Sequence, residues 1–293
     1  MSAVAELPGS RRLSAGRFLI YTVLILFAAF YLLPLFVMVS TSLKSLDEIR
    51  AGNLLDLPQA ITFEPWIRAW SSACVGIECV GVKGYFFNSI RMAIPAVLIS
   101  TLLGALNGYV LTKWKFKGAD LLFTLMLFGC FIPFQIVLIP MAYILGKLGL
   151  TGSITGLVVV HVTYGLCFTT LFFRNYYAAL PDELVKAAMI DGAGFFRIFF
   201  RILLPCSIPI IVVTVIWQFT NIWNDFLFGV TFAPGGGAPI TVALNNIVNT
   251  STGVKEYNVH MAAAIYAALP TLLVYILAGR YFVRGLMAGS VKG

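Results

Sequence analysis

Residues 18–39 read FLIYTVLILFAAFYLLPLFVMV, an apolar run of 22 residues without a charged side chain. A helix rises about 1.5 Å per residue, so a helix of this length crosses the hydrocarbon core of a bilayer. The run is longer than the core of a signal peptide, which has about 7–15 residues, and no small-residue cleavage pattern follows it. We therefore expect it to stay in the protein as a membrane anchor.

Further apolar runs of similar length divide the rest of the chain. Hydrophobic residues make up 60% of the chain and charged residues 11%, whereas about a quarter of the residues in soluble domains are charged. In lipid every backbone polar group needs an internal partner, and helices supply one. The sequence therefore predicts an all-α membrane protein with six transmembrane helices, at 18–39, 92–111, 121–145, 154–173, 206–230 and 261–279.

Lys and Arg side chains gather on one side of this predicted topology. Cytoplasmic loops are enriched in them, so the richer side is predicted to be the cytoplasm. The net charge of +8 lies in short clusters beside the apolar runs, which argues against a nucleic-acid partner. With the N-terminus inside, thirteen of the twenty basic residues are cytoplasmic: Arg11, Arg12, Arg17, Lys113, Lys115, Lys117, Arg174, Lys186, Arg197, Arg201, Arg280, Arg284 and Lys292.

An even number of spans places both termini in the cytoplasm. The predicted segments are a cytoplasmic N-terminal tail at 1–17, the first transmembrane helix at 18–39, an extracytoplasmic loop with short helices at 40–85, a transmembrane core at 86–285 that includes a cytoplasmic loop at 181–205, and a cytoplasmic C-terminal tail at 286–293.

Cys74 and Cys79 are the cysteines that lie in a polar loop. They can form a disulfide only if the 40–85 loop faces an oxidising compartment. Cys130, Cys167 and Cys206 lie in apolar runs, where small buried thiols are expected.

The 181–205 loop is a charged segment in an otherwise apolar chain. Pro181 pre-sets a first helical turn, and Asp182 and Glu183 complement the positive N-terminal dipole. Gly192 is expected to end this short helix. The helix is predicted to present a narrow stripe of small side chains to another protein, at positions i, i+3, i+4 and i+7: Leu184, Ala187, Ala188 and Asp191.

A second helix is expected after Gly192, until Pro205 and Pro209 turn the chain back into the membrane. Arg197 and Arg201 form its basic face. On physical grounds alone, a pair of amphipathic helices that meets anionic lipid explains the segment equally well. The predicted apolar face of the second helix consists of Phe196, Phe199, Phe200 and Leu203.

Several spaced features of this loop resemble one family. The Ala-Ala-x-x-Asp-Gly-Ala core at 187–193, the ten-residue step from Gly192 to Ile202 and the closing Leu204-Pro205 resemble the cytoplasmic coupling loop of binding-protein-dependent ABC importer permeases. The resemblance implies the type I ABC importer permease fold. It also implies a coupling helix that contacts an ATPase through Asp182, Glu183, Leu184, Lys186, Ala187, Ala188, Asp191, Gly192, Ala193, Arg197 and Pro205.

The resemblance covers essentially residues 15–293. Phe87-Asn88-Ser89, 221–226 and 283–289 look like carbohydrate-uptake permeases of the maltose-importer type, and 244–249 with 254–259 is similar to the glucose/mannose branch. This implies a permease subunit that translocates a sugar, glucose or mannose. A permease for a disaccharide or another small solute is the alternative.

The family also implies partners in a bacterial or archaeal inner membrane. These are a second permease subunit in a heterodimer, two ATP-binding subunits and an extracytoplasmic sugar-binding protein. The chain has no G-x-x-x-x-G-K-[ST] phosphate loop. We therefore expect a transporter subunit and not an enzyme, without a cofactor or metal site of its own, while the ATPase binds ATP and Mg²⁺.

One position departs from the family motif, which usually opens Glu-Ala-Ala. The resemblance implies that this glutamate contacts a basic residue of the ATPase in the family, whereas this chain has Lys186-Ala187-Ala188. We expect Lys186 to face an acidic or backbone acceptor on the ATPase instead.

Polar residues near the outer half of the fifth predicted span suggest a translocation pathway. Polar groups inside a membrane mark functional sites by default, yet interhelical hydrogen bonds explain them equally well. In maltose-type relatives the paired permease subunit dominates substrate contact. For His161 we expect a packing role. The candidate pathway residues are Gln218, Asn221, Trp223, Asn224, Asp225, Asn88 and Gln135.

Two other classes of membrane protein remain open. The first is a membrane-embedded enzyme, such as a lipid-modifying transferase. Against it, the sequence shows no paired carboxylates and no His/Asp or Cys/His arrangement near the membrane surface. A stand-alone secondary transporter is less natural because the six spans show no evident inverted repeat, although dimerisation would rescue it.

Overall fold

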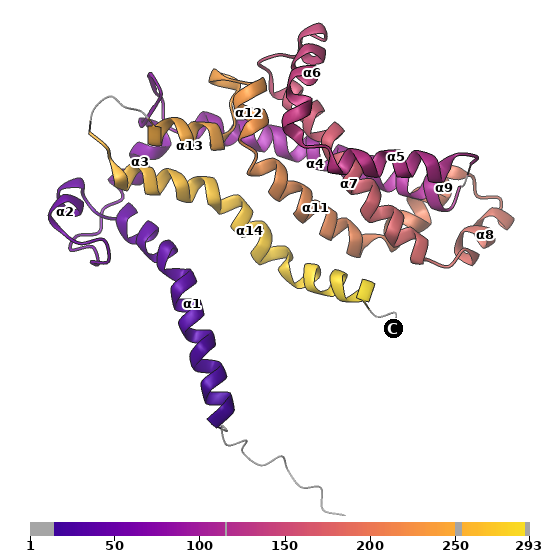
Figure 1. Cartoon of the computed structure of the whole chain (residues 1–293), viewed down its shortest axis with the longest axis horizontal. Coiled ribbons are helices and arrows are strands. Elements are labelled where there is room, and N and C mark those ends of the chain that lie inside the picture. Colours follow the sequence, from indigo (N-terminus) through magenta and orange to yellow (C-terminus); the bar gives the residue numbers. More distant parts are fainter. Residues whose placement is uncertain (1–14, 115, 250–253, 291–293) are drawn as a thin grey trace, which may run out of the picture.

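The computed structural model describes residues 15–114, 116–249 and 254–290, which are mostly helical and form an elongated bundle (Figure 1). The predicted tail at 1–17 falls largely outside these residues. Within them, the helices long and apolar enough to cross a membrane unbroken are α1 (Ala15–Ser42), α4 (Lys83–Thr112), α7 (Ile154–Ala179) and α14 (Tyr257–Ser290). α14 continues to Ser290, past the predicted start of the C-terminal tail at 286.

Two further predicted spans are bent pairs of helices. α5 (Ala119–Phe131) and α6 (Phe134–Lys147) meet at 103°. The predicted span at 121–145 is therefore broken into two helices, because Pro133 has no N–H to continue the helix and takes an extended ψ of 126°. If each bent pair is one span, the described chain has up to 6 spans, as the sequence predicts.

The second bent pair follows the 181–205 loop. Its first arm consists of α9 (Phe195–Ile198), a π-helical turn η1 (Phe199–Leu203) and α10 (Leu204–Cys206). Its second arm is α11 (Ile208–Trp223), and the two arms meet at 79°.

α11 ends before residue 230, where the predicted span ended. Asp225 begins a new helix, α12 (Leu227–Phe232), because its carboxylate accepts the backbone N–H of Phe228 at 3.3 Å and of Gly229 at 3.1 Å. The short η2 turn (Gly235–Gly237) and α13 (Ile240–Asn249) complete the connection towards α14.

α4 and α7 form the closest helix pair of the bundle. A Cβ built on Gly104 would collide with Thr169, and one built on Gly108 would lie 2.7 Å from the Cβ of Phe173. The small-xxx-small spacing of the two glycines therefore lets the helix backbones approach closely.

Short elements gather at one end of the bundle. They are α2 (Leu46–Ala51), α3 (Glu64–Ser71) and an antiparallel hairpin of β1 (Cys74–Val75) and β2 (Glu78–Cys79) that a Cys74–Cys79 disulfide closes. The short helices expected in 40–85 are thus present. Asn88 Nδ2 donates to the carbonyl oxygens of Gly236 and Ala238, and this contact ties α4 to the loop before α13.

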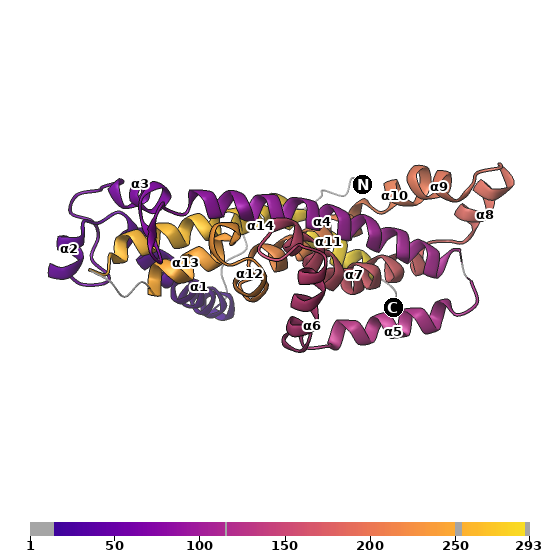
Figure 2. The same ribbon diagram turned by 90° about the horizontal axis from the view of Figure 1, so that it is seen from above.

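The helix that follows α7, α8 (Glu183–Ile190), lies with α9 at the opposite end of the bundle from α2 and α3, as both views show (Figures 1 and 2). α1 diverges from the bundle along its length (Figure 1), and none of its most apolar window is buried. Most of its side chains are therefore exposed in the isolated chain, whereas Ser40, Thr41 and Ser42 at its end are buried.

Candidate functional site

α8 is tied to the end of α4 at its first turn. The Lys113 side chain is 4% exposed, and its Nζ donates to the carbonyl oxygen of Leu180 and to Asp182 Oδ1, both at 2.6 Å. The helix begins at Glu183, just after the start expected at Pro181. In the sequence Lys113 is one of several charges predicted to be cytoplasmic, and no pattern there reveals its contact with Asp182.

One face of α8 packs against the bundle. Val185 is 4% exposed and Ala188 7%, whereas Ile190 is 86% exposed. The predicted stripe of small side chains is therefore wrong for Ala188, which faces inward because Val185 and Ala188 share the side that meets α9 and η1. The exposed face still includes Leu184, Lys186, Ala187 and Asp191.

Gly192 ends α8 as the sequence predicts. Its φ of +74° lies in the left-handed region that favours glycine. The backbone N–H of Ala193 then reaches the carbonyl oxygen of Ala188 at 2.9 Å, which caps the end of the helix.

The segment after Gly192 is anchored in the bundle by aromatic contacts. Phe199 and Leu203 are buried, but Phe196 is 65% exposed and Phe200 52%. The predicted single face of these four residues is therefore wrong, because the chain passes into a π-helical turn at Phe199 and the spacing changes. On α4, Tyr109 stacks on Phe195 at 4.8 Å and on Phe199 at 6.0 Å between ring centroids. Arg197 remains exposed.

The bend that follows Pro205 is held by the end of α7. Tyr176 donates its hydroxyl proton to the carbonyl oxygen of Cys206 at 2.7 Å. Ser207 Oγ lies 3.0 Å from the hydroxyl of Tyr177, which is fully buried. The loop that carries α8 is therefore connected to α4, α7 and α11 at once.

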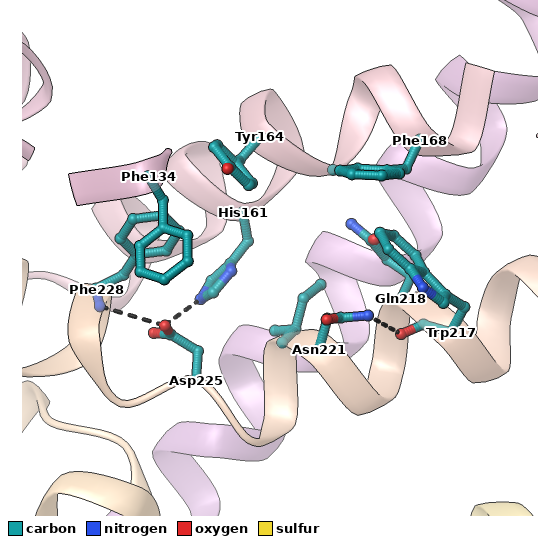
Figure 3. A pocket seen from close by; sticks show the side chains of 11 residues that line it. Phe134, His161, Tyr164, Phe168, Trp217, Gln218, Asn221, Asp225 and Phe228 are labelled. Atoms are coloured by element: carbon teal, nitrogen blue, oxygen red, sulfur yellow. Dashed lines mark hydrogen bonds and ion pairs between the residues drawn. The ribbon is translucent and has the colours of Figure 1, made fainter. Parts of the chain in front are cut away.

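A separate pocket of about 300 Å³ opens between α6, α7 and α11 (Figure 3). Aromatic rings form two groups in its wall. Phe168 and Trp217 lie 4.8 Å apart between centroids, and Phe228 lies 5.7 Å from Tyr164 and 6.1 Å from Phe134. Tyr164 is fixed by a 2.8 Å hydrogen bond from its hydroxyl to the carbonyl oxygen of Ile132, at the break between α5 and α6.

Polar groups from α7, α11 and the turn after α11 complete the wall of this pocket. His161 Nε2 lies 3.7 Å from Asp225 Oδ2 (Figure 3), beyond hydrogen-bond distance. This buried nitrogen has no hydrogen-bond partner in the described part of the chain. Asn221 Nδ2 donates to the carbonyl oxygen of Trp217 at 2.8 Å, while the residue stays exposed.

Gln218 reaches the pocket because α7 has a glycine opposite it. Gln218 is 2% exposed, and a Cβ built on Gly165 would collide with its side-chain amide. The crossing of α7 and α11 at this point therefore requires the absence of a side chain at Gly165.

Residues 96–287 match the family described as the binding-protein-dependent transport system inner membrane component. The chain belongs to this family. It is a membrane transport subunit and not an enzyme, and membership implies an ATPase and a substrate-binding protein as partners.

Relatives of this permease include sugar permeases. It is 41% identical to a probable ABC transporter permease protein of Pyrococcus horikoshii, over 97% of this chain and 100% of the relative. It is 32% identical to the xylose/arabinose import permease of Haloferax volcanii, over 91% and 90%. It is 29% identical to a permease of the diacetylchitobiose uptake system of Streptomyces coelicolor, over 93% and 88%. The permease is therefore of the carbohydrate-uptake type.

A solved structure matches the fold of the permease. A bacterial ABC transporter involved in the import of the acidic polysaccharide alginate has a chain that matches with a TM-score of 0.79 at 19% identity, over 94% of this chain and 100% of that chain. The fold is the type I ABC importer permease fold.

The pathway residues predicted for the permease divide into two groups. Gln218, Asn221 and Asp225 line the pocket. The others lie elsewhere: Trp223 is 1% exposed and donates its Nε1–H to the carbonyl oxygen of Ala267, Asn88 holds the loop before α13, Asn224 caps α11, and Gln135 is exposed on α6 outside the pocket lining.

His161 and the aromatic side chains of the pocket were not among the predicted pathway residues of the permease. They come from α6, α7, α11 and the segment after α11. His161, Tyr164 and Phe168 share one face of α7 at positions i, i+3 and i+7, but no spacing in the sequence connects this face with Phe134, Trp217 or Phe228. Within 15–114, 116–249 and 254–290, no three His, Cys, Asp or Glu residues come together to hold a metal ion.

Proposed function

We propose that this permease carries a sugar across the inner membrane, and that a separate ATPase binds α8 and drives the transport. The observation that carries the proposal is the exposed face of α8 at the end of the bundle opposite the disulfide-closed hairpin (Figure 1). A disulfide is stable in an oxidising compartment. This supports a topology in which the hairpin is extracytoplasmic, and α8 and both termini are cytoplasmic.

The assembly that we propose has four further subunits or partners of three kinds. A second permease subunit completes the translocation pathway, two ATP-binding subunits bind ATP and Mg²⁺, and an extracytoplasmic sugar-binding protein delivers the substrate. The exposed apolar surface of α1 supports a membrane environment with protein or lipid around this helix.

Movement of α8 has a direct route into the bundle. Lys113 connects the first turn of α8 to α4, and Tyr109 of α4 stacks on Phe195 of α9. Tyr177 of α7 contacts Ser207 at the bend. A displacement that ATP binding imposes on α8 is thereby passed to the helices that form the pocket. The residues that make this connection are packed or hydrogen-bonded, so they transmit movement better than a solvated loop does.

For the substrate we propose glucose or mannose, on the resemblance of 244–249 and 254–259 to that branch. The named relatives take up xylose or arabinose and diacetylchitobiose, and this range supports sugars as a class. A disaccharide or another small solute is the alternative.

Reconstitution tests the proposal. The protein is purified from its membrane with its associated chains, placed in proteoliposomes and supplied with the binding protein. Import of radiolabelled glucose or mannose should require ATP, and one of these sugars should stimulate ATP hydrolysis more than xylose or maltose does. Uptake driven by an ion gradient without ATP would contradict the proposed mechanism, and a larger response to maltose would replace the proposed substrate.

A further inference from the structure

We propose that the pocket between α6, α7 and α11 is a binding site for one pyranose ring within this subunit, and that His161 and Asp225 together bind one of its hydroxyl groups. The inference rests on the proposed function, since it assumes that a sugar passes through the permease. It assigns substrate contact to this chain itself, and it gives His161 a role in binding that its sequence position does not suggest.

The wall of the pocket has the chemistry that a sugar ring requires. A pyranose presents an apolar face of C–H groups and a rim of hydroxyl groups. The rings of Phe168 and Trp217 supply an apolar surface, and Asn221 and Asp225 present oxygen atoms from the α11 side (Figure 3). Binding sites for small molecules commonly combine a mainly apolar lining with a few polar groups that orient the ligand.

His161 supplies an independent sign of a missing ligand. Its side chain is 6% exposed, and its Nε2 is buried without a hydrogen-bond partner among the described residues. A buried polar atom without a partner costs about 1–3 kcal/mol. Asp225 Oδ2 is too distant to satisfy it at 3.7 Å, so a hydroxyl group that contacts both side chains would supply the missing bond.

The size of the pocket limits the ligand. A volume of about 300 Å³ is at the lower end of the range of known ligand sites, which is about 300–1,000 Å³. This volume suits a single ring. Further rings of a longer sugar would extend through the open side of the pocket.

The pocket is also connected to the segment that carries α8, where we propose that the ATPase binds. Gln218 and Gly165 meet where α11 crosses α7, and the inner ends of the same two helices are joined through Ser207 and Tyr177. A change in the angle between α7 and α11 would therefore alter the pocket.

Glucose binding to the purified transporter tests the proposal. Saturation-transfer NMR, without the binding protein, detects weak contact between glucose protons and the protein. The variants are His161→Phe, Asn221→Leu and Asp225→Asn, each in the complete complex with its second permease and ATPase. Asp225→Asn keeps one oxygen that can accept a backbone N–H of α12, so it removes the charge and retains one of the two bonds to Phe228 and Gly229. Thr220→Val is the matched control, because Thr220 lies on α11 outside the pocket and donates to Ile216.

Each pocket variant should weaken glucose binding by about tenfold, the effect of one lost hydrogen bond to a buried or charged group. Thr220→Val should bind glucose as the wild type does. Unchanged glucose affinity in all pocket variants would overturn the proposal, while ATP-driven import by the wild type would still support the proposed function. If Asn221→Leu instead releases the second permease during purification, the pocket holds a side chain of that subunit and not a sugar. If the wild type imports no sugar with ATP, the proposed function fails, and this proposal fails with it.

Discussion

Lys113 and Lys186 line the same shallow cavity beside α8, yet their surroundings differ. Lys113 is buried and bonded to Leu180 and Asp182, so it holds the start of α8 on α4. Lys186 is exposed and forms no ion pair within the described residues. Lys186, exposed on the outer face of α8, is suited to contact another chain, whereas Lys113 stabilises the packing of α8 within this chain.

Reversing the charge of Lys186 tests whether this side chain contacts the ATPase. Lys186→Glu should weaken docking of the ATPase, because a carboxylate placed opposite an acidic or carbonyl acceptor is repelled. We expect sugar-stimulated ATP hydrolysis and the amount of co-purified ATPase to fall by about tenfold, with a smaller loss in Lys186→Met.

Lys117→Glu is the control for this prediction, because it makes the same charge change at an exposed position of the same end of the bundle. Sugar-stimulated hydrolysis in Lys186→Glu that equals the wild-type rate would refute the proposed contact of Lys186.

At the scale of the helices, the α4–α7 contact supports both proposed sites. Lys113 and Tyr109 on α4 hold α8 and α9, and His161 on α7 lines the pocket. Gly104 and Gly108 of α4 determine how closely these helices pack. The small residues therefore matter beyond their own contacts, since the relative position of the two sites depends on this pair of helices.

We expect Gly108→Ala to lower the stability of the permease by about 1–3 kcal/mol, because the new methyl group would lie 2.7 Å from the Cβ of Phe173 and forces a shift. The measurement is the temperature at which half of the purified protein remains monodisperse. Gly84→Ala on the same helix has no atom within 4 Å of the new Cβ and serves as the control. Equal thermal stability of the two variants would show that the helices can separate without cost.

At the scale of the whole molecule, the two ends of the bundle have different chemistry. One end has the disulfide-closed hairpin, whose tip residue Ile77 is fully exposed, and the other has α8 and its exposed lysine. Between these ends runs the long apolar helix α4 (Figure 2). This arrangement supports a molecule that spans a membrane, with a different partner at each face.

Sidedness follows from the hairpin. After mild reduction of intact cells, a membrane-impermeant maleimide should label Cys74 and Cys79, because we place them outside the cell. Labelling should disappear in a Cys74→Ser, Cys79→Ser double variant, which accounts for reaction at other cysteines. Labelling of the pair only in inverted vesicles would reverse the proposed topology and place α8 away from the ATPase.

The sequence alone determined those features that depend on local composition and backbone freedom. Apolar runs mark the membrane-crossing segments, Gly192 ends α8, and the spacing of Gly104 and Gly108 indicates a close helix contact. These features need no knowledge of distant residues, because length, charge and the absence of a side chain decide them.

Only the tertiary structure decided how distant residues meet. It turned Ala188 inward, paired Lys113 with Asp182 and brought His161 beside Asp225. Each of these outcomes depends on how one helix packs against another, and residues on different helices have no fixed spacing in the sequence. Periodicity describes the faces of a helix, but the neighbouring helices decide which face is covered.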